Sequence, residues 1–109
     1  MPIRNFVSAF EELVMRAIIC LGDNAYGVPI REAIEQATGR RISTGALYIT
    51  LQRLLEKGFI SARMGEATAQ RGGRAKKYFA VESAGREALA TSNEIRSVFA
   101  AEIDLGFAS

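Results

Sequence analysis

Residues 43–53 carry the side chains of this chain that could make specific contacts with nucleic-acid bases. If the segment is helical, at about 100° per residue, one arc faces away from a row of leucines. The residues on that arc are Gly45, Tyr48, Ile49, Gln52 and Arg53. Gln52 could pair with adenine, Arg53 could reach guanine or a phosphate, and Ile49 could meet a thymine methyl group, with Gly45 permitting close approach. A solvated helix face is the plain alternative, and an outward isoleucine argues against it.

Basic residues are concentrated in the middle of the chain, although the net charge is only +2. Residues 40–78 contain nine basic and two acidic side chains and carry +7, whereas the rest of the chain carries −5. This split suggests one surface that meets a polyanion. Arg41 lies near the start of this basic segment and is followed by Ser43 and Thr44. Their hydroxyls could hold a phosphate together with the free N–H groups of a first helical turn.

A second cluster of cations occupies residues 71–77. It combines glycine flexibility with four cations and no acid, which suits a loop that follows a phosphate backbone or enters a minor groove. The predicted contacts in this stretch are Arg71, Gly73, Arg74, Lys76 and Lys77. An ordinary charged loop is the alternative for the stretch taken alone.

The composition excludes most catalytic and metal-binding chemistry. The chain has no histidine and a single cysteine, Cys20, so it can form neither an internal disulfide nor a Cys/His metal site. Cys20 lies in an apolar run and is expected to be a small buried hydrophobe. Glu11 and Glu12 are successive residues that cannot face one another on a helix, and we interpret them as solvated or capping residues. We therefore expect no enzyme, no cofactor and no metal.

Length and hydropathy predict one soluble domain. The 109 residues are 49% hydrophobic, which is enough for a single core. No run of about 18 apolar residues occurs, and the N-terminus reaches acidic residues too soon for a signal peptide. We expect a cytoplasmic protein that contacts no membrane.

The apolar periodicity predicts three helices in the first half of the chain. Residues 5–21 form the first, and Met15 and Ile19 lie off its main stripe, which suggests a second contact surface such as a dimer interface. The second has Pro29 in its first turn and is closed by a left-handed Gly39. The third starts at an N-cap, Ser43, and buries its leucines.

A hairpin and a last helix complete the predicted fold. Residues 59–64 and 76–81 read as strands, and Ser83 is the expected N-cap of the last helix. The fold class is mainly α with a small antiparallel β-hairpin, that is, a winged helix-turn-helix plus a C-terminal dimerisation helix. We assign residues 1–82 to the winged-helix DNA-binding domain and residues 83–109 to the dimerisation helix.

The last helix carries an apolar stripe with no evident internal partner beyond the first helix. A two-fold homodimer would bury this stripe. Its residues are Leu89, Ile95, Val98, Phe99 and Ile103.

Five short motifs resemble the PadR family of bacterial regulators, over roughly residues 10–90. Gly-x-Leu-Tyr and the Gly-Gly-Arg stretch at this mutual spacing are the most specific of them. The motifs are Ala25-Tyr26-Gly27, Ser43-Thr44-Gly45-Ala46-Leu47-Tyr48, Leu54-Leu55-Glu56-Lys57-Gly58, Gly72-Gly73-Arg74 with Lys77-Tyr78-Phe79, and Ala84-Gly85-Arg86.

The resemblance implies a winged-helix repressor that dimerises through its last helix with help from its N-terminal helix, where Phe6 and Phe10 are the candidates. It implies that Tyr48 faces DNA and that Arg74 is the wing arginine. It also implies that a small aromatic or cationic effector binds between the helices of the dimer. Ile49 departs from the proline or alanine of many relatives, and the single C-terminal helix is like that of the short members.

Together these patterns predict a sequence-specific transcriptional regulator, a repressor that binds double-stranded DNA as a homodimer. The alternative is a winged-helix module that binds protein and not DNA, because fold alone does not fix function. The +7 segment argues against that alternative.

Overall fold

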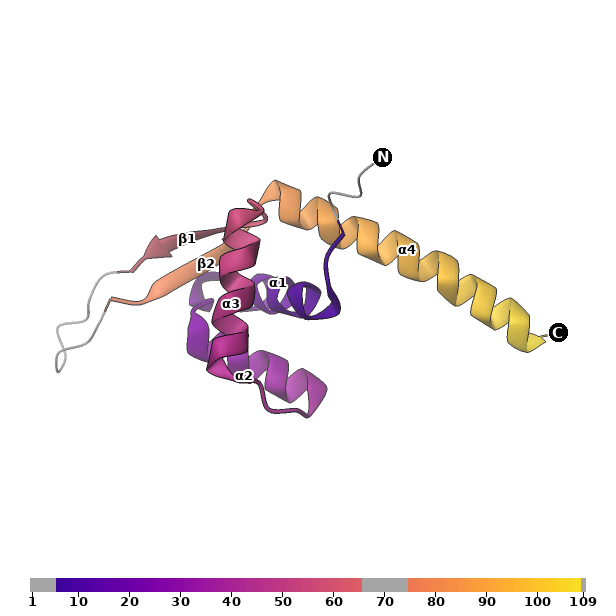
Figure 1. Ribbon diagram of the computed structural model, residues 1–109, viewed down its shortest axis with the longest axis horizontal. Helices are drawn as coiled ribbons and strands as arrows, with labels where there is room; N and C mark the ends of the chain where they lie inside the picture. Colours follow the sequence, from indigo (N-terminus) through magenta and orange to yellow (C-terminus); the bar gives the residue numbers. More distant parts are fainter. Residues whose placement is uncertain (1–5, 66–74, 109) are drawn as a thin grey trace.

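The computed structural model describes residues 6–65 and 75–108, with side chains described up to residue 103. The predicted element order and fold class are confirmed (Figure 1). The elements are α1 (Ala9–Leu21), a short 3₁₀ turn (Gly22–Asn24), α2 (Gly27–Thr38), α3 (Thr44–Glu56), β1 (Ile60–Met64), β2 (Lys77–Val81) and α4 (Ser83–Ala108).

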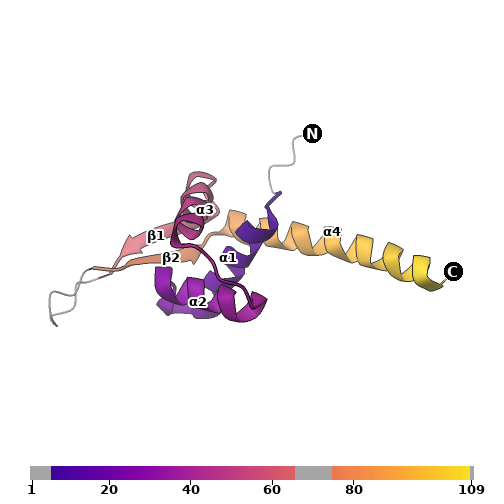
Figure 2. The ribbon, with the colours of Figure 1, turned by 60° about the horizontal axis from the view of Figure 1, so that its bottom comes forward.

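The molecule consists of a head with two projections. Helices α1, α2 and α3 pack together in the head, while the hairpin of β1 and β2 extends from one end and α4 from the other (Figures 1 and 2). The long α4 helix gives the chain extents of 64 × 33 × 22 Å. The hairpin and the far part of α4 therefore lie on opposite sides of α3.

Helix α1 begins at Ala9, later than predicted, because Ser8 forms a capping box. The Ser8 hydroxyl accepts from the Glu11 backbone N–H at 3.1 Å, and Glu11 Oε1 accepts from the Ser8 N–H at 2.8 Å. These two bonds satisfy amides that a helix start leaves without partners, and residues 6–8 lie outside the helix. The capping interpretation of Glu11 is therefore confirmed.

The core is formed by one face from each element of the head, and it encloses α1 more completely than the periodicity predicted. Met15, which was expected to contact a dimer partner, is fully buried in the chain's own core. Cys20, which was expected to be buried, is exposed on the opposite side of α1. The core residues are Val14, Met15, Ala17, Ile18, Ala25, Ile30, Ile34, Leu47, Leu51, Leu54, Phe59, Ile60, Phe79, Ala88 and Leu89.

The predicted end of α2 and the predicted start of α3 are confirmed. Gly39 ends α2 in the left-handed conformation at φ +70°, and its N–H donates to the Glu35 carbonyl at 2.8 Å. Ser43 caps α3, with its hydroxyl accepting from the Ala46 N–H at 3.1 Å. Thr50, which was not expected in the core, is buried among the leucines of α3.

The hairpin is attached to the helices through backbone hydrogen bonds. Strands β1 and β2 are antiparallel, with Ile60 opposite Val81 and Met64 opposite Lys77. The Phe79 N–H donates to the Ala25 carbonyl at 2.8 Å, which joins β2 to the connection between α1 and α2. This bond fixes the direction in which the hairpin leaves the head.

Helix α4 starts directly after β2 and one residue earlier than its predicted cap implies. Ser83 is already helical, and the Glu82 carbonyl accepts from the Arg86 N–H at 3.0 Å. The Glu82 N–H in turn donates to the Phe59 carbonyl at 2.9 Å. The first turn of α4 is therefore bonded to the start of the hairpin.

A buried carboxylate connects α1 to α4. Glu12, predicted to be solvated or capping, is 5% exposed. Its oxygens accept from Arg16 at 3.2 Å and from Arg96 at 3.1 Å, and Arg16 also donates to Asn93 at 2.6 Å. Since Asn93 and Arg96 lie on α4, these bonds hold the angle at which α4 leaves the head.

Glu11 connects α1 to the end of α3 through Lys57, with 2.8 Å between Lys57 Nζ and Glu11 Oε2. Burial alone would raise the pKa of the Glu11 carboxyl. Hydrogen bonds from Lys57 and Ser8, together with the Lys57 charge, outweigh burial and hold the pKa below its ordinary value of 4.5. The folded protein therefore favours the ionised form.

Acidification is expected to weaken the fold through Glu11. Because the folded pKa is depressed, its stabilising contribution is present above about pH 4.5 and is lost as the pH falls through the folded pKa. Urea unfolding from about pH 7 to about pH 3 should show Glu11→Gln less stable than wild type by on the order of 1 kcal/mol near neutrality. The two stability curves should converge in acid, and curves that stay parallel would contradict this account.

Candidate nucleic-acid interface

The outward face of α3 carries the side chains that the sequence placed there. Tyr48 is 49% exposed and Ile49 57% exposed, and Gly45, Gln52 and Arg53 are also exposed. The opposite face of the helix supplies Leu47, Leu51 and Leu54 to the core. Hydrogen-bond donors, hydrogen-bond acceptors and an apolar side chain are thus exposed on one side of a helix whose other side is packed into the core.

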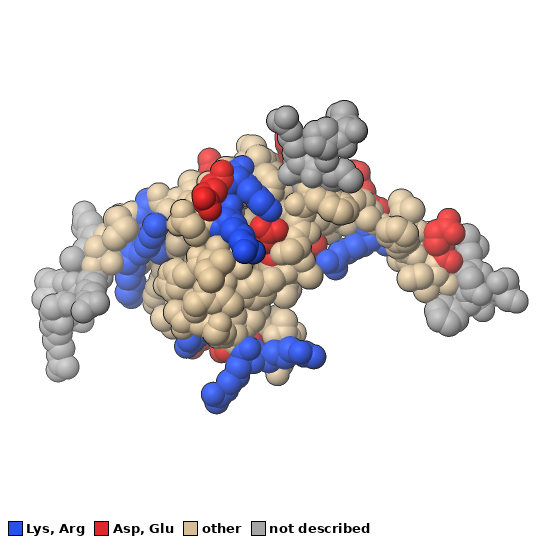
Figure 3. Space-filling view, in the orientation of Figure 1, with Lys and Arg blue, Asp and Glu red and all other residues tan. Residues whose placement is uncertain are grey.

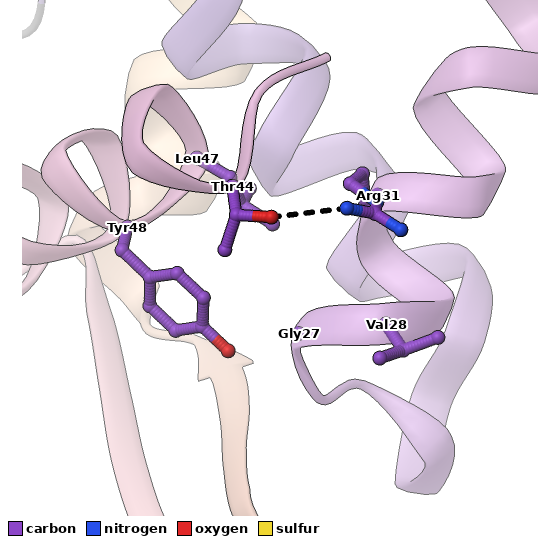
Figure 4. A pocket seen from close by; sticks show the side chains of 6 residues that line it. All are labelled: Gly27, Val28, Arg31, Thr44, Leu47 and Tyr48. Carbon is purple, nitrogen blue, oxygen red and sulfur yellow. Dashed lines mark hydrogen bonds between the residues drawn. The ribbon is translucent and has the colours of Figure 1, made fainter. Parts of the chain in front are cut away.

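The first turn of α3 is held by α2 through a contact that the sequence analysis missed. Arg31 Nη1 donates to Thr44 Oγ1 at 3.0 Å (Figure 4). Glu35 Oε2, one turn further along α2, accepts from the Ile42 N–H at 2.7 Å. Thr44, a predicted phosphate contact, therefore already has a partner. No local signal marks Arg31, because its role depends on how α2 and α3 cross.

Tyr48 reaches from α3 to the start of α2. Its ring points toward Gly27, beside a hollow of about 70 Å³ that Val28 and Arg31 also line (Figure 4). A Cβ atom on Gly27 would come within 3.1 Å of Tyr48 Cζ, so a side chain at this position would displace the Tyr48 ring from its present place. Packing against Gly27 orients the Tyr48 ring while leaving half of the residue exposed.

The far end of the hairpin strands, where Met64 pairs with Lys77, is held by two aromatic rings with a cation on each side. Lys76 Nζ lies 4.3 Å from the centre of the Tyr26 ring, and Tyr26 meets Tyr78 edge to face at 5.5 Å. Arg63 of β1 stacks on Tyr78 at 4.8 Å. Lys76 and the neighbouring Lys77 are exposed. The predicted contacts Arg71, Gly73 and Arg74 lie outside the described residues.

An open cleft of about 310 Å³ separates this end of the hairpin from the helices. It is lined by Val28 of α2, Tyr48 of α3, Met64 of β1 and the two lysines. In the view that faces α3, basic atoms gather over the upper end of α3, beside the hairpin, and at the lower end where α2 joins α3 (Figure 3). Arg41, in that connection, is exposed. Two lysines therefore line the cleft and basic atoms lie at both ends of α3, with acidic atoms beside those at the upper end (Figure 3).

The sequence model of the PadR-like family of transcriptional regulators matches residues 18–91. This chain belongs to that family. Among solved structures, a PadR family regulator from Clostridium difficile R20291 is 19% identical with a TM-score of 0.67, over 93% of this chain and all of that one. A PadR-like regulator from Bacillus cereus is 18% identical with a TM-score of 0.71, over 92% of each chain. These likenesses show the winged-helix fold.

Bacillus subtilis PadR, solved in complex with operator DNA, is also similar. It is 20% identical with a TM-score of 0.63, over 77% of this chain and 46% of that one. Comparison with curated proteins found no match.

The predicted dimerisation residues of this PadR-like chain divide into two groups. Leu89 is 6% exposed in the core of its own chain and does not belong to an uncovered face, because α4 packs its first turns on the head. Phe10 is half-buried against the same core. Ile95 is half-buried and lines a hollow of about 150 Å³ with Phe6. The exposed group, between 55% and 63% accessible, is Phe6, Val98, Phe99 and Ile103.

Within residues 6–65 and 75–108, two kinds of site are absent. No group of three or more Asp, Glu, Cys or His residues there could hold a metal ion. No described helix is both long enough and apolar enough to cross a membrane.

Proposed function

We propose that this PadR-like regulator binds double-stranded DNA in a sequence-specific manner, as a homodimer and without enzymatic activity. The observation that carries the proposal is the outward face of α3, where Tyr48, Ile49 and Gln52 are exposed on a helix anchored by its buried leucines. Such a helix fits a major groove, while a basic hairpin fits the neighbouring phosphates or minor groove. The operator complex of Bacillus subtilis PadR supports this assignment.

The chain would then divide its tasks along its length. Residues 1–82 form the DNA-binding unit, and α4 from residue 83 joins two subunits after its first turns have packed on the head. A dimer of this kind acts in the cytoplasm and represses a gene by occupying its operator, a mode that needs DNA binding alone.

Selection from a random DNA pool tests the proposal. The wild-type chain should enrich one sequence with two related half-sites, as two-fold symmetry requires. Binding should weaken as salt rises, because phosphate contacts release counterions. A chain that enriches no sequence would instead support the protein-interaction alternative.

Variants of the hairpin and of α3 should separate affinity from discrimination. The double variant Lys76→Ala, Lys77→Ala removes phosphate contacts, so its affinity for operator and for random DNA should fall about equally. The slope of log affinity against log salt concentration should fall by roughly 0.9 per lost contact. Gln52→Ala removes an adenine partner and should weaken operator binding by about 1 to 3 kcal/mol with little loss on random DNA. Gel shifts across a salt series measure both effects.

Arg86→Ala is the matched control for the lysine variant. Arg86 is an exposed cation on α4 that lines a separate hollow with Ile18 and Asp23. Its loss should leave the salt slope nearly unchanged. If the lysine variant changed the ranking of sequences while Gln52→Ala preserved it, the two roles would be reversed.

A small aromatic or cationic effector between the helices of the dimer remains part of the proposal. The hollow beside α4 measures about 150 Å³ and is lined by Phe6, Val7, Glu12, Ser92, Ile95 and Arg96. Pockets for organic ligands usually exceed about 300 Å³. A second subunit would therefore have to complete the effector site.

A further inference from the structure

Ile49 is an exposed side chain that the fold itself does not explain. It is 57% exposed in the middle of α3, outside the buried face that anchors the helix. A β-branched residue is also a weaker helix former than alanine or leucine, because its χ1 rotation is restricted against the preceding turn. Neither helix propensity nor core packing thus accounts for an isoleucine here.

The neighbours of Ile49 on α3 are suited to contact base edges. Gly45 lies one turn earlier and has nothing within 4 Å of where a Cβ would stand, so the backbone can come close to a surface. Gln52 lies three residues later on the same side, about 5 to 6 Å away in a regular helix. An apolar group is thus flanked by open space and by an amide that can bond adenine in the bidentate manner.

We infer that Ile49 determines part of the operator specificity by contacting the C5 methyl group of a thymine. This inference rests on the proposed function. The thymine methyl is the apolar group among the base edges of the major groove, so it is the natural partner for an exposed aliphatic side chain on a helix that enters it. With Gln52 one turn away, each half-site contains this thymine close to an adenine.

Val28 is an exposed apolar residue of the head that serves as the matched control, because it lies on a different helix. Val28 belongs to the first turn of α2 and lines the hollow beside Tyr48 (Figure 4). Val28 is 54% exposed, close to the value for Ile49. Val28→Ala removes a similar exposed apolar surface beside Tyr48, so it should lower the affinity for the thymine and uracil operators equally while leaving the outward face of α3 unchanged.

The test replaces each thymine of the selected operator, one at a time, with deoxyuridine, which lacks only the methyl group. Wild type should bind about fourfold more weakly when the contacted thymine of one half-site is replaced, and roughly 15-fold more weakly when both are. Ile49→Ala should bind the thymine and uracil operators equally, whereas Ile49→Val and Val28→Ala should keep the discrimination. Circular dichroism should show that all three variants are folded.

Three results would overturn the inference while leaving the proposed function intact. These are a selected half-site without thymine, an operator that tolerates uracil at every position, and an Ile49→Ala variant that discriminates as well as wild type. A chain that enriches no DNA sequence would overturn the proposed function and the inference with it.

Discussion

Replacement of Phe99 with aspartate is expected to convert a dimeric protein into a monomer. Phe99 is 63% exposed on α4, between Val98 at 62% and Ile103 at 57%. A two-fold interface buries one copy of each side chain from each subunit, so the variant removes two phenylalanines from the interface. At about 2 kcal/mol each, this loss amounts to about 4 kcal/mol, or roughly a 1000-fold weaker dimer.

Sedimentation at micromolar concentration measures this change, and Ser97→Asp supplies the control. Ser97 is exposed and precedes Val98, but it lies on the other side of α4, so the same charge there should leave the dimer intact. Operator affinity should fall with dimerisation in Phe99→Asp only. A wild-type chain that sediments as a monomer would exclude the proposed dimer.

The substitution Gly85→Ala should destabilise the fold strongly. Gly85 is buried where α4 meets the hairpin, and an added Cβ would lie 2.8 Å from Val81 Cγ1 and 3.1 Å from the Phe59 carbonyl carbon. That carbonyl cannot easily move, because it already accepts from the Glu82 N–H. Overpacking of this kind costs about 3 kcal/mol, which lowers Tm by roughly 10 to 20 °C in a domain of this size.

Gly45→Ala is the matched control, because nothing lies within 4 Å of its Cβ position. Because Gly45 is the second residue of α3, alanine there should raise stability by at most about 0.5 kcal/mol, while the new methyl group on the outward face of α3 weakens operator binding. Thermal unfolding must be followed at one protein concentration, since dimerisation makes Tm depend on it. Wild-type stability in Gly85→Ala would contradict the close packing at the start of α4.

Features with local causes could be predicted from the sequence. The limits of α2 and α3 follow from Gly39 and Ser43, whose backbone conformation and side-chain bonds act within a few residues. The start of α1 could have been placed as well, because Ser8 and Glu11 have the spacing of a capping box. The exposed arc of α3 follows from helical geometry once its leucines are assigned to the core.

Features that depend on how the elements pack could not be predicted in this way. Glu12 can be buried as a carboxylate because Arg96, 84 residues away in the sequence, donates a hydrogen bond to it. Arg31 was missed because its partner lies on another helix. Met15 and Leu89 were assigned to an interface, since periodicity shows that a residue is apolar but not whether its partner belongs to the same chain.

The three tyrosines give the chain an optical signal of its own. Tyr26 directly precedes α2, Tyr48 lies on α3 and Tyr78 lies on β2. The chain has no tryptophan. Ultraviolet emission from the unlabelled protein therefore comes from the proposed DNA-binding surface, while α4 contains no tyrosine. A change in that emission should follow DNA binding directly, and pairing of two α4 helices should leave it almost unchanged.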